Sequence, residues 1–245
     1  MSTEIELSSH LLHYKRLSQK SSLVALPTRS CPIPLILSRA YTVPVKLPVP
    51  GQELVALIVA VSFAAGLNVY ATLATLGLLA HSGVLVLPDT LHLLASWWVI
   101  GASAALFAVE FFADKVPAFD LVWNALHTFI RIPVAALIAW RATATLSPQE
   151  QLVATLLGAA IAFAAHGGKT AIRAAVTPSP EPLSNIGLSL GEDVVAVSLT
   201  WLSTRHPYAA AAIAAVLVLI VILLIRWVWR ALRSLFRSAE RILQT

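Results

Sequence analysis

Charged side chains are scarce in this chain of 245 residues, since lysine, arginine, aspartate and glutamate together make up only 12% of it. A soluble domain carries about 25% of such residues. Apolar residues make up 58% of the chain, and its mean hydropathy is +0.80. A water-soluble fold could not cover that much apolar surface, whereas a lipid bilayer accommodates it. The composition therefore predicts an integral membrane protein whose main partner is the bilayer.

Cysteine is almost absent, and the common catalytic motifs are missing. Cys31 is the only cysteine, which excludes an intrachain disulfide and a thiolate zinc cluster. No His-Glu-x-x-His, Gly-x-Ser-x-Gly, phosphate-binding glycine loop or dinucleotide fingerprint occurs in the sequence. We therefore expect no catalytic residue and no cofactor, with a divalent cation left open as a bound group.

The distribution of the basic residues matches that of a membrane protein. The formal net charge is +5, and the basic residues gather in the N-terminal tail, beside apolar segments and after the last of these segments. This distribution is typical of the positive-inside pattern and not of a surface that contacts nucleic-acid phosphates. We therefore expect no nucleic-acid partner.

Three regions differ in composition. Residues 1–50 are basic and rich in proline, which predicts a disordered tail or a start codon assigned too far upstream. Residues 51–230 form the predicted transmembrane helical domain. Residues 231–245 form a basic C-terminal tail, which we expect on the cytoplasmic side.

Long apolar stretches predict an all-α, polytopic transmembrane helix bundle with about six membrane segments. The segments are 54–80, 93–109, 130–146, 148–166, 190–204 and 208–225. The first runs for 27 uncharged residues, whereas about 20 cross a bilayer, so it is either tilted or broken near Gly66-Leu67-Asn68. The segment 190–204 is short, and it either crosses the membrane or re-enters it.

Capping residues and prolines predict where several helices begin and end. Ser147-Pro148-Gln149-Glu150 and Ser189-Leu190-Gly191-Glu192 have the pattern of capping boxes, which predicts helix starts at Pro148 and Leu190. Asp89 is a predicted cap after Pro88. Pro117 is expected to stop a helix, and a short amphipathic helix is expected from Asp120 to His127.

The six-segment interpretation also fixes an orientation. Six crossings place both termini on the same side, and the arginine-rich C-terminus indicates that this side is cytoplasmic. Lys115, Lys169 and Arg173 then also lie inside, in agreement with the tail. The expected location is the inner membrane of a bacterium.

Glu110 and Asp114 are the first candidates for a polar site within the membrane. Glu110 follows an uncharged segment and lies one helical turn before Asp114, so the two carboxylates share one helix face. Their mutual repulsion favours a cation, a nearby base or a proton between them. Alternatively, Glu110 lies at the interface and pairs with Lys115 or Arg173.

Three further acids have alternative explanations of different strength. Asp120 is explained as a helix cap as well as by a ligand-binding role. The capping box explains Glu192 without any function. It does not explain Asp193, a second acid directly beside the first in a chain with few charges.

The cations Lys169 and Arg173 follow His166 and two glycines. Both are explained as cytoplasmic anchors. Alternatively, Gly167-Gly168 exposes backbone amides that hold an anion, such as a phosphate headgroup, together with these two cations. His166 is either a proton relay or an ordinary residue at a helix end.

These motifs together carry a family resemblance. They are Gly66-Leu67-Asn68, Glu110-x-x-x-Asp114-Lys115-x-Pro117-x-x-Asp120, His166-x-x-Lys169-x-x-x-Arg173 and Ser189-x-x-Glu192-Asp193. With them the chain resembles, over roughly residues 55–205, the bacterial membrane family known as domain of unknown function 4126. The resemblance implies a membrane protein and assigns no activity.

The sequence leaves three classes of function open. The leading hypothesis is a transporter or channel-like permease for a small charged solute, with the candidate residues forming one polar cluster near the cytoplasmic side. A second is a membrane-embedded enzyme that acts on a phosphorylated lipid, with the carboxylates holding a divalent ion. A third is a non-catalytic scaffold subunit.

Overall fold

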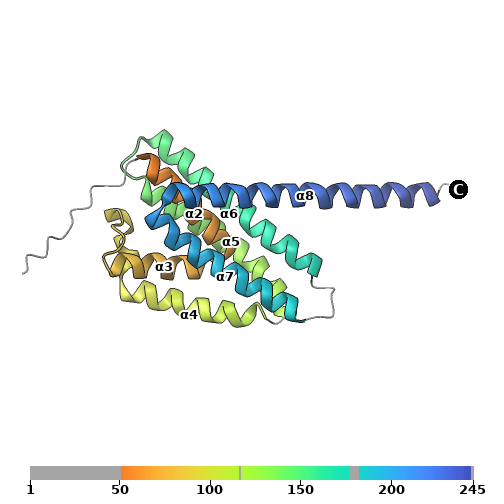
Figure 1. Cartoon of the computed structure of the whole chain (residues 1–245), viewed down its shortest axis with the longest axis horizontal. Coiled ribbons are helices and arrows are strands. Elements are labelled where there is room, and N and C mark those ends of the chain that lie inside the picture. The colour runs from red at the N-terminus through yellow and green to blue at the C-terminus, as the bar shows by residue number, and fades with distance from the viewer. Residues whose placement is uncertain (1–50, 116, 177–181, 244–245) are drawn as a thin grey trace, which may run out of the picture. The chain divides into compact units, whose positions relative to one another are not determined.

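The computed structural model describes residues 51–115, 117–176 and 182–243, and the predicted N-terminal tail lies outside them. In the described residues every regular element is helical, as predicted (Figure 1). The elements in chain order are α2 (Gly51–Leu67), α3 (Val69–His81), the 3-10 helix η1 (Asp89–Ala95), α4 (Trp97–Ala113), α5 (Pro117–Ala142), α6 (Pro148–Val176), α7 (Pro182–Arg205) and α8 (Pro207–Leu243).

The first uncharged stretch is broken at Asn68, which separates α2 from α3. Asn68 has extended backbone angles of φ −146° and ψ 103°, and its side-chain oxygen accepts a hydrogen bond of 2.9 Å from the Ala71 N–H. An asparagine in this role replaces the missing helical acceptor at the start of α3. Of the two alternatives for this stretch, the break is therefore the correct one.

The helices α2 and α3 enter and leave at the same end of the bundle. α2 runs parallel to α6, because Gly158 lies against Ser62 and Gly66 lies against Ala162. Its first turns and the last turn of α3 both pack on an apolar cluster that includes Ala142, the last residue of α5. Figure 1 shows α3 running back from the end of α2. The helices α2 and α3 therefore form a pair that doubles back, with Asn68 at its tip.

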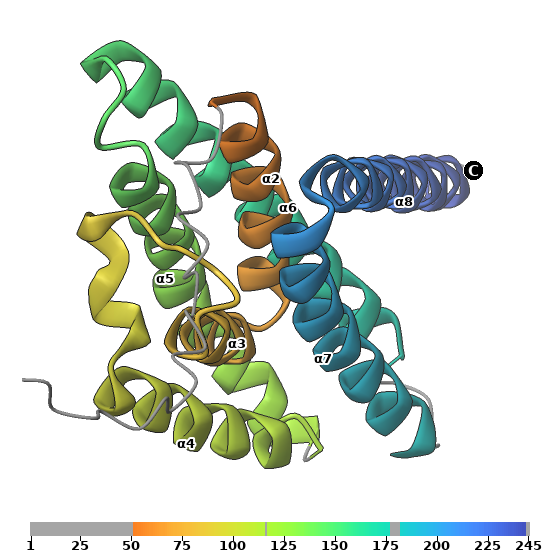
Figure 2. The ribbon, with the colours of Figure 1, turned by 60° about the vertical axis from the view of Figure 1, so that its left-hand side comes forward.

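A glycine permits the close approach of α2 and α6. A Cβ atom at Gly66 would lie 2.5 Å from the Ala162 carbonyl oxygen and 2.7 Å from the Ala165 Cβ atom. The lack of a side chain at this position therefore lets the two backbones touch, which is a common device in membrane helix packing. Figure 2, in which α3 is seen nearly end-on, shows α2 among α5, α6 and α7.

The helices η1 and α4 lie where the second span was predicted, and they meet at an angle of 61°. The Ser96 hydroxyl accepts the Val99 N–H at 3.4 Å and so caps α4. The prediction that Asp89 is a cap was wrong, because Asp89 is the first residue of η1 and Pro88 occupies the capping position without a side-chain hydrogen bond.

The helix α5 is continuous from Pro117 to Ala142, whereas the sequence predicted a short helix followed by a separate span. Pro117 begins this helix, where its missing N–H costs nothing. Pro133 lies inside it and removes one backbone hydrogen bond without ending the helix. Membrane helices tolerate such a proline because neighbouring groups satisfy the freed carbonyl. Arg131 is consequently an interior residue of α5.

The first predicted capping box is confirmed. The Ser147 N–H donates to Glu150 Oε2 at 3.1 Å, and the Glu150 N–H donates to the Ser147 hydroxyl at 3.4 Å. The helix α6 that begins here does not loosen at Gly167-Gly168 but continues to Val176. The predicted end at residue 166 was therefore wrong.

The second predicted capping box does not cap a helix. The helix α7 begins at Pro182, so Ser189 and Glu192 are interior residues. Ser-x-x-Glu has the same spacing on one helix face as at a helix start, and the sequence pattern alone does not separate the two. The segment is not short, because residues Ile186–Arg205 are long and apolar enough to cross a membrane.

Among the described residues, four helices have the length and composition to cross a membrane: α5, α6, α7 and α8. The bent pair of η1 and α4 makes up to five, and α2 and α3 are shorter apolar helices. α8 continues past its apolar part to Leu243, so the region assigned as a C-terminal tail continues this helix. The molecule thus has the helices of a multi-pass membrane protein.

Candidate functional site

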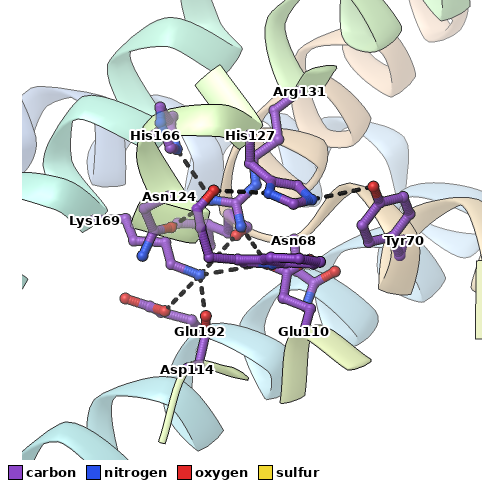
Figure 3. Close-up of polar contacts among 12 residues, drawn as sticks. Asn68, Tyr70, Glu110, Asp114, Asn124, His127, Arg131, His166, Lys169 and Glu192 are labelled. Atoms are coloured by element: carbon purple, nitrogen blue, oxygen red, sulfur yellow. Dashed lines mark hydrogen bonds and ion pairs between the residues drawn. The ribbon is translucent and has the colours of Figure 1, made fainter. Parts of the chain in front are cut away.

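Seven ionisable side chains from four helices meet inside the bundle, and we call them the charged cluster. Its members are Glu110 and Asp114 at the end of α4, Arg131 of α5, Lys169 and Arg173 of α6, and Glu192 and Asp193 of α7. Glu110 and Arg131 are 0% exposed, and Lys169 is 2% exposed. Figure 3 shows five of these side chains converging from separate helices.

A fully buried ion pair joins α4 to α5. Arg131 Nη2 donates to Glu110 Oε1, and neither side chain is exposed. Nη1 of the same guanidinium contacts Asn124 Oδ1 at 3.3 Å and His166 Nδ1 at 3.0 Å. A buried guanidinium needs several acceptors because its desolvation is expensive. Glu110 is therefore part of an interhelical pair and not an interfacial residue that pairs with Lys115.

The ammonium group of Lys169 lies among four oxygen atoms. Its Nζ atom is 3.1 Å from Asp114 Oδ2 and 3.1 Å from Glu192 Oε2. It is also 3.3 Å from the Leu67 carbonyl oxygen and 3.6 Å from Glu110 Oε1. The Leu67 carbonyl is exposed to this contact because α2 ends there. Three carboxylate oxygens and one carbonyl oxygen thus compensate the charge of this buried ammonium group.

Arg173 links the end of α4 to α7. Its Nη2 atom lies 3.0 Å from Asp114 Oδ2 and 2.6 Å from Glu192 Oε2. The Ser189 hydroxyl, one turn before Glu192 on α7, reaches Asp114 Oδ2 at 3.5 Å. Arg173 and Lys169 thus share the same two carboxylates, which holds α4, α6 and α7 together at this level.

Asp193 is held by an amide rather than by a cation. Its Oδ1 atom accepts a hydrogen bond of 2.8 Å from Asn68 Nδ2, at the break between α2 and α3. Its Oδ2 atom is buried and has no hydrogen-bond partner among the described residues. The same is true of Glu110 Oε2 and Asp114 Oδ1. Buried carboxylate oxygens normally have partners, so these acceptors mark a place where a proton or a cation would be stabilised.

The acids of the charged cluster outnumber its bases. Its carboxylates are Glu110, Asp114, Glu192 and Asp193, and its cations are Arg131, Lys169 and Arg173, which gives four against three. With every group ionised, this sum leaves one negative charge in a site that excludes most water. Such a charge is costly within a membrane unless a proton or another cation accompanies it.

A chain of neutral polar groups continues from the cluster along α5. The Thr128 hydroxyl lies 2.7 Å from His166 Nε2. His127 Nε2 lies 3.1 Å from the Tyr70 hydroxyl of α3. The first contact connects α5 to α6, and the second connects α5 to the start of α3. Figure 3 shows the contact between His127 and Tyr70.

The structure brings together most of the residues proposed from the sequence. Glu110, Asp114, Lys169, Arg173 and Glu192 are joined by direct contacts, and His166 is joined to them through Arg131. The Asp193 side chain, next to Glu192 on α7, contacts Asn68 instead. Lys115 lies apart from them, because its Nζ atom donates to the Phe111 carbonyl at 2.7 Å and lies over the Phe111 ring. The Asp120 side chain lies outside the described residues, although its backbone belongs to α5.

The anion site suggested by Gly167-Gly168 has no backbone donors in this structure. Both glycines are inside α6, so their N–H groups are directed along the helix. Gly168 instead packs against the Val221 side chain of α8. Lys169 and Arg173 are buried among carboxylates, and the interpretation as cytoplasmic anchors therefore does not apply to them.

Arg131, Asn124, His127 and Asn68 were not identified as site residues from the sequence. A signal was present for three of them, because Asn124, His127 and Arg131 recur at helical spacing and so share one face of a helix. That signal was hidden because the sequence was divided into a short helix that ends at His127 and a separate span that begins at residue 130. Asn68 was seen only as a helix breaker, and its contact with Asp193 joins distant parts of the sequence.

A helical membrane bundle with a buried charged cluster beside the break between α2 and α3 is the class of protein that this structure defines. Its family is also established. The chain belongs to the family described as domain of unknown function (DUF4126), whose profile matches residues 55–227. No curated protein and no solved structure matches the chain.

Proposed function

We propose that this protein is a transporter or channel-like permease for a small cation, and that the charged cluster is the site the cation occupies on its way. The observation that carries the proposal is the set of four oxygens around the Lys169 ammonium, with contacts of 3.1 to 3.6 Å. A lysine in this position is a cation tethered to the protein. A diffusible cation that binds there either displaces the Lys169 ammonium group from these oxygens or shares the same carboxylates with it.

The charge balance favours a cation over an anion as the solute. One carboxylate of the cluster has no basic partner in the contacts described above, and this is Asp193. An added cation neutralises the remaining negative charge, whereas an added anion increases it. A proton on Asp193 has the same effect, so Asp193 is also the residue proposed to exchange protons.

The helix break at Asn68 supports transport as the class of function. Backbone groups that leave regular helix geometry at membrane depth are tolerated where they are buried in protein or line a polar path. Here the freed Leu67 carbonyl contacts Lys169, and the Asn68 side chain contacts Asp193. Transporters commonly use the ends of discontinuous helices to coordinate ions in this way.

The alternative of a lipid-processing enzyme with a divalent ion has less support. Asp114 and Glu192 are directed at Lys169 and Arg173, and no three metal-ligating side chains converge within the described ranges. The scaffold alternative does not account for a buried excess of carboxylates. We propose the cytoplasmic side of a cell membrane for the end of the bundle that carries the cluster, since arginines follow the last span.

The test is solute flux in liposomes that contain the purified protein. The panel is H⁺, Na⁺, K⁺, ammonium and guanidinium, with chloride and inorganic phosphate as anions. We expect flux of at least one cation and of neither anion. Asp193→Asn is expected to lower this flux at least about tenfold, because an isosteric amide cannot ionise or take up a proton.

The matched control is Asp89→Asn, the same chemical change at the first residue of η1 and outside the cluster. It should leave the flux unchanged. Flux of an anion alone, or equal cation flux in the Asp193→Asn protein and the unmodified protein, would overturn the proposal. Metal-dependent turnover of a phosphorylated lipid without any flux would favour the enzyme instead.

A further inference from the structure

A cavity of about 540 Å³ lies beside the charged cluster, between α2, α6, α7 and α8. Its walls are apolar, with Phe63, Ile172, Leu217 and Val221 among them. The volume is within the range of pockets that hold drug-sized molecules, about 300 to 1,000 Å³. The cavity is therefore large enough for a ligand and is not a packing defect.

Two glycines of α7 keep this cavity open. Gly187 and Gly191 both line it, and they lie one helical turn apart. A Cβ atom added to either would meet nothing within 4 Å. The space directly in front of them is thus available to a ligand or to an added side chain.

One wall of the cavity is α8, a helix with many exposed apolar side chains. Several of its lining residues come from α8, and neighbouring side chains of that helix, such as Leu219 and Leu223, are 55% and 53% exposed. Exposed leucines on a helix of a membrane protein face lipid. A ligand with an apolar body therefore reaches this cavity from within the bilayer, where such molecules accumulate.

The charged groups at the cavity are Lys169 and Glu192. The Lys169 side chain is 0% exposed, whereas the Glu192 side chain is 12% exposed, so the carboxylate is the group that a ligand contacts. The cluster behind it holds one more acid than base. A ligand with a positive charge at one end therefore matches this site, and one with a negative charge does not.

We propose that this cavity binds an amphiphilic cation, with its apolar body against α2, α7 and α8 and its positive charge at Glu192. The inference extends the proposed function, since it assigns organic cations that enter from the lipid as a ligand class of the same cluster. Binding does not depend on transport of inorganic cations, so the two are tested separately.

The experiment measures binding of radiolabelled tetraphenylphosphonium to the full-length protein in lipid nanodiscs, with empty nanodiscs as the blank. We expect saturable binding to the protein. Gly191→Leu and Gly187→Leu should each weaken it at least about tenfold, because the new side chain occupies the ligand's space. Gly101→Leu is the control, since a Cβ atom at this position in α4 also meets nothing within 4 Å and it is outside the cavity.

Competition then identifies the charge and the source of the ligand. Decyltrimethylammonium should displace the probe at a concentration at least about tenfold lower than decyl sulfate. Equal displacement by the two, or displacement by anionic phosphatidylglycerol in the nanodisc, would overturn the assignment to a cation. Unchanged binding in both glycine variants, with the thermal stability of each preserved, would show that the cavity is not the site. Cation flux without tetraphenylphosphonium binding would remove this inference and leave the proposed function intact.

Discussion

Removing one member of the Glu110–Arg131 pair should destabilise the protein far more than removing both. Each side chain is fully buried, so Glu110→Leu leaves a buried guanidinium and Arg131→Met leaves a buried carboxylate. A stranded charge of this kind typically costs about 3–5 kcal/mol, whereas replacing a whole buried pair with apolar side chains is often neutral. The double variant also keeps the charge difference in the cluster, with three acids against two bases instead of four against three.

The coupling free energy between the two positions is the quantity to measure. We expect more than about 3 kcal/mol in favour of the double variant, because a double variant that is more stable than either single variant requires a coupling larger than the cost of one stranded charge. The coupling is obtained from the unfolding free energies of the four proteins in a double-mutant cycle. Unfolding is followed in bicelles by steric trapping or by titration with a denaturing detergent.

The control cycle pairs Glu110→Leu with Arg141→Met. Arg141 is also an arginine of α5, but it is exposed and its side chain has no contact with the cluster. Its effect should add to that of Glu110→Leu within about 0.5 kcal/mol. A coupling below that value for Glu110 and Arg131 as well would refute the idea that each compensates the buried charge of the other.

Further predictions concern packing and topology. Gly66→Ala should cost about 1–3 kcal/mol of unfolding free energy, because its Cβ atom would lie 2.5 Å from the Ala162 carbonyl oxygen, whereas Gly101→Ala has open space and should be neutral or stabilising; equal effects would disprove the close contact. In a Cys31→Ser background, an impermeant maleimide should label Gln52→Cys and Gly83→Cys from the same side, and labelling from opposite sides would mean that α2 and α3 cross. Reporter fusions after Arg241 and within 177–186 should read cytoplasmic and those within 82–90 external, with the opposite signal from 177–186 counting against this orientation. Deleting residues 2–48 should leave insertion and the melting temperature unchanged, and a large drop in that temperature would show that the segment is part of the fold.

The apolar character and the positions of most helices were predictable from the sequence because they depend on local composition. Long uncharged stretches gave the membrane class, and the Ser147–Glu150 capping box gave the start of α6. Errors arose where one residue type has two uses. Pro117 was expected only to stop a helix, and it also begins α5, which runs without the break expected between His127 and residue 130. Ser189 and Glu192 resemble a cap but face a buried cluster.

The candidate site was predictable for those residues whose charged side chains lie within or beside apolar segments. Glu110, Asp114 and Asp193 stood out because ionisable side chains are rare in this chain. The pairing was not predictable, since contacts such as Asn68 with Asp193 and Lys169 with the Leu67 carbonyl join residues far apart in sequence. The orientation predicted for the two termini needs an even number of crossings. The labelling experiment proposed above tests that prediction, because a helix pair that begins and ends on the same side adds no crossing to the count.

Asn68 uses both ends of one amide group, and this has a mechanical consequence. Its oxygen receives the Ala71 N–H in the first turn of α3, while its nitrogen donates to Asp193 on α7. Only a side chain with a donor and an acceptor on the same short arm serves both partners. A translation of α7 along its axis would therefore displace the first turn of α3, because the amide group that links them is planar and rigid. Asn68 thus couples the position of α7, the longer helix, to that of α3, the shorter one.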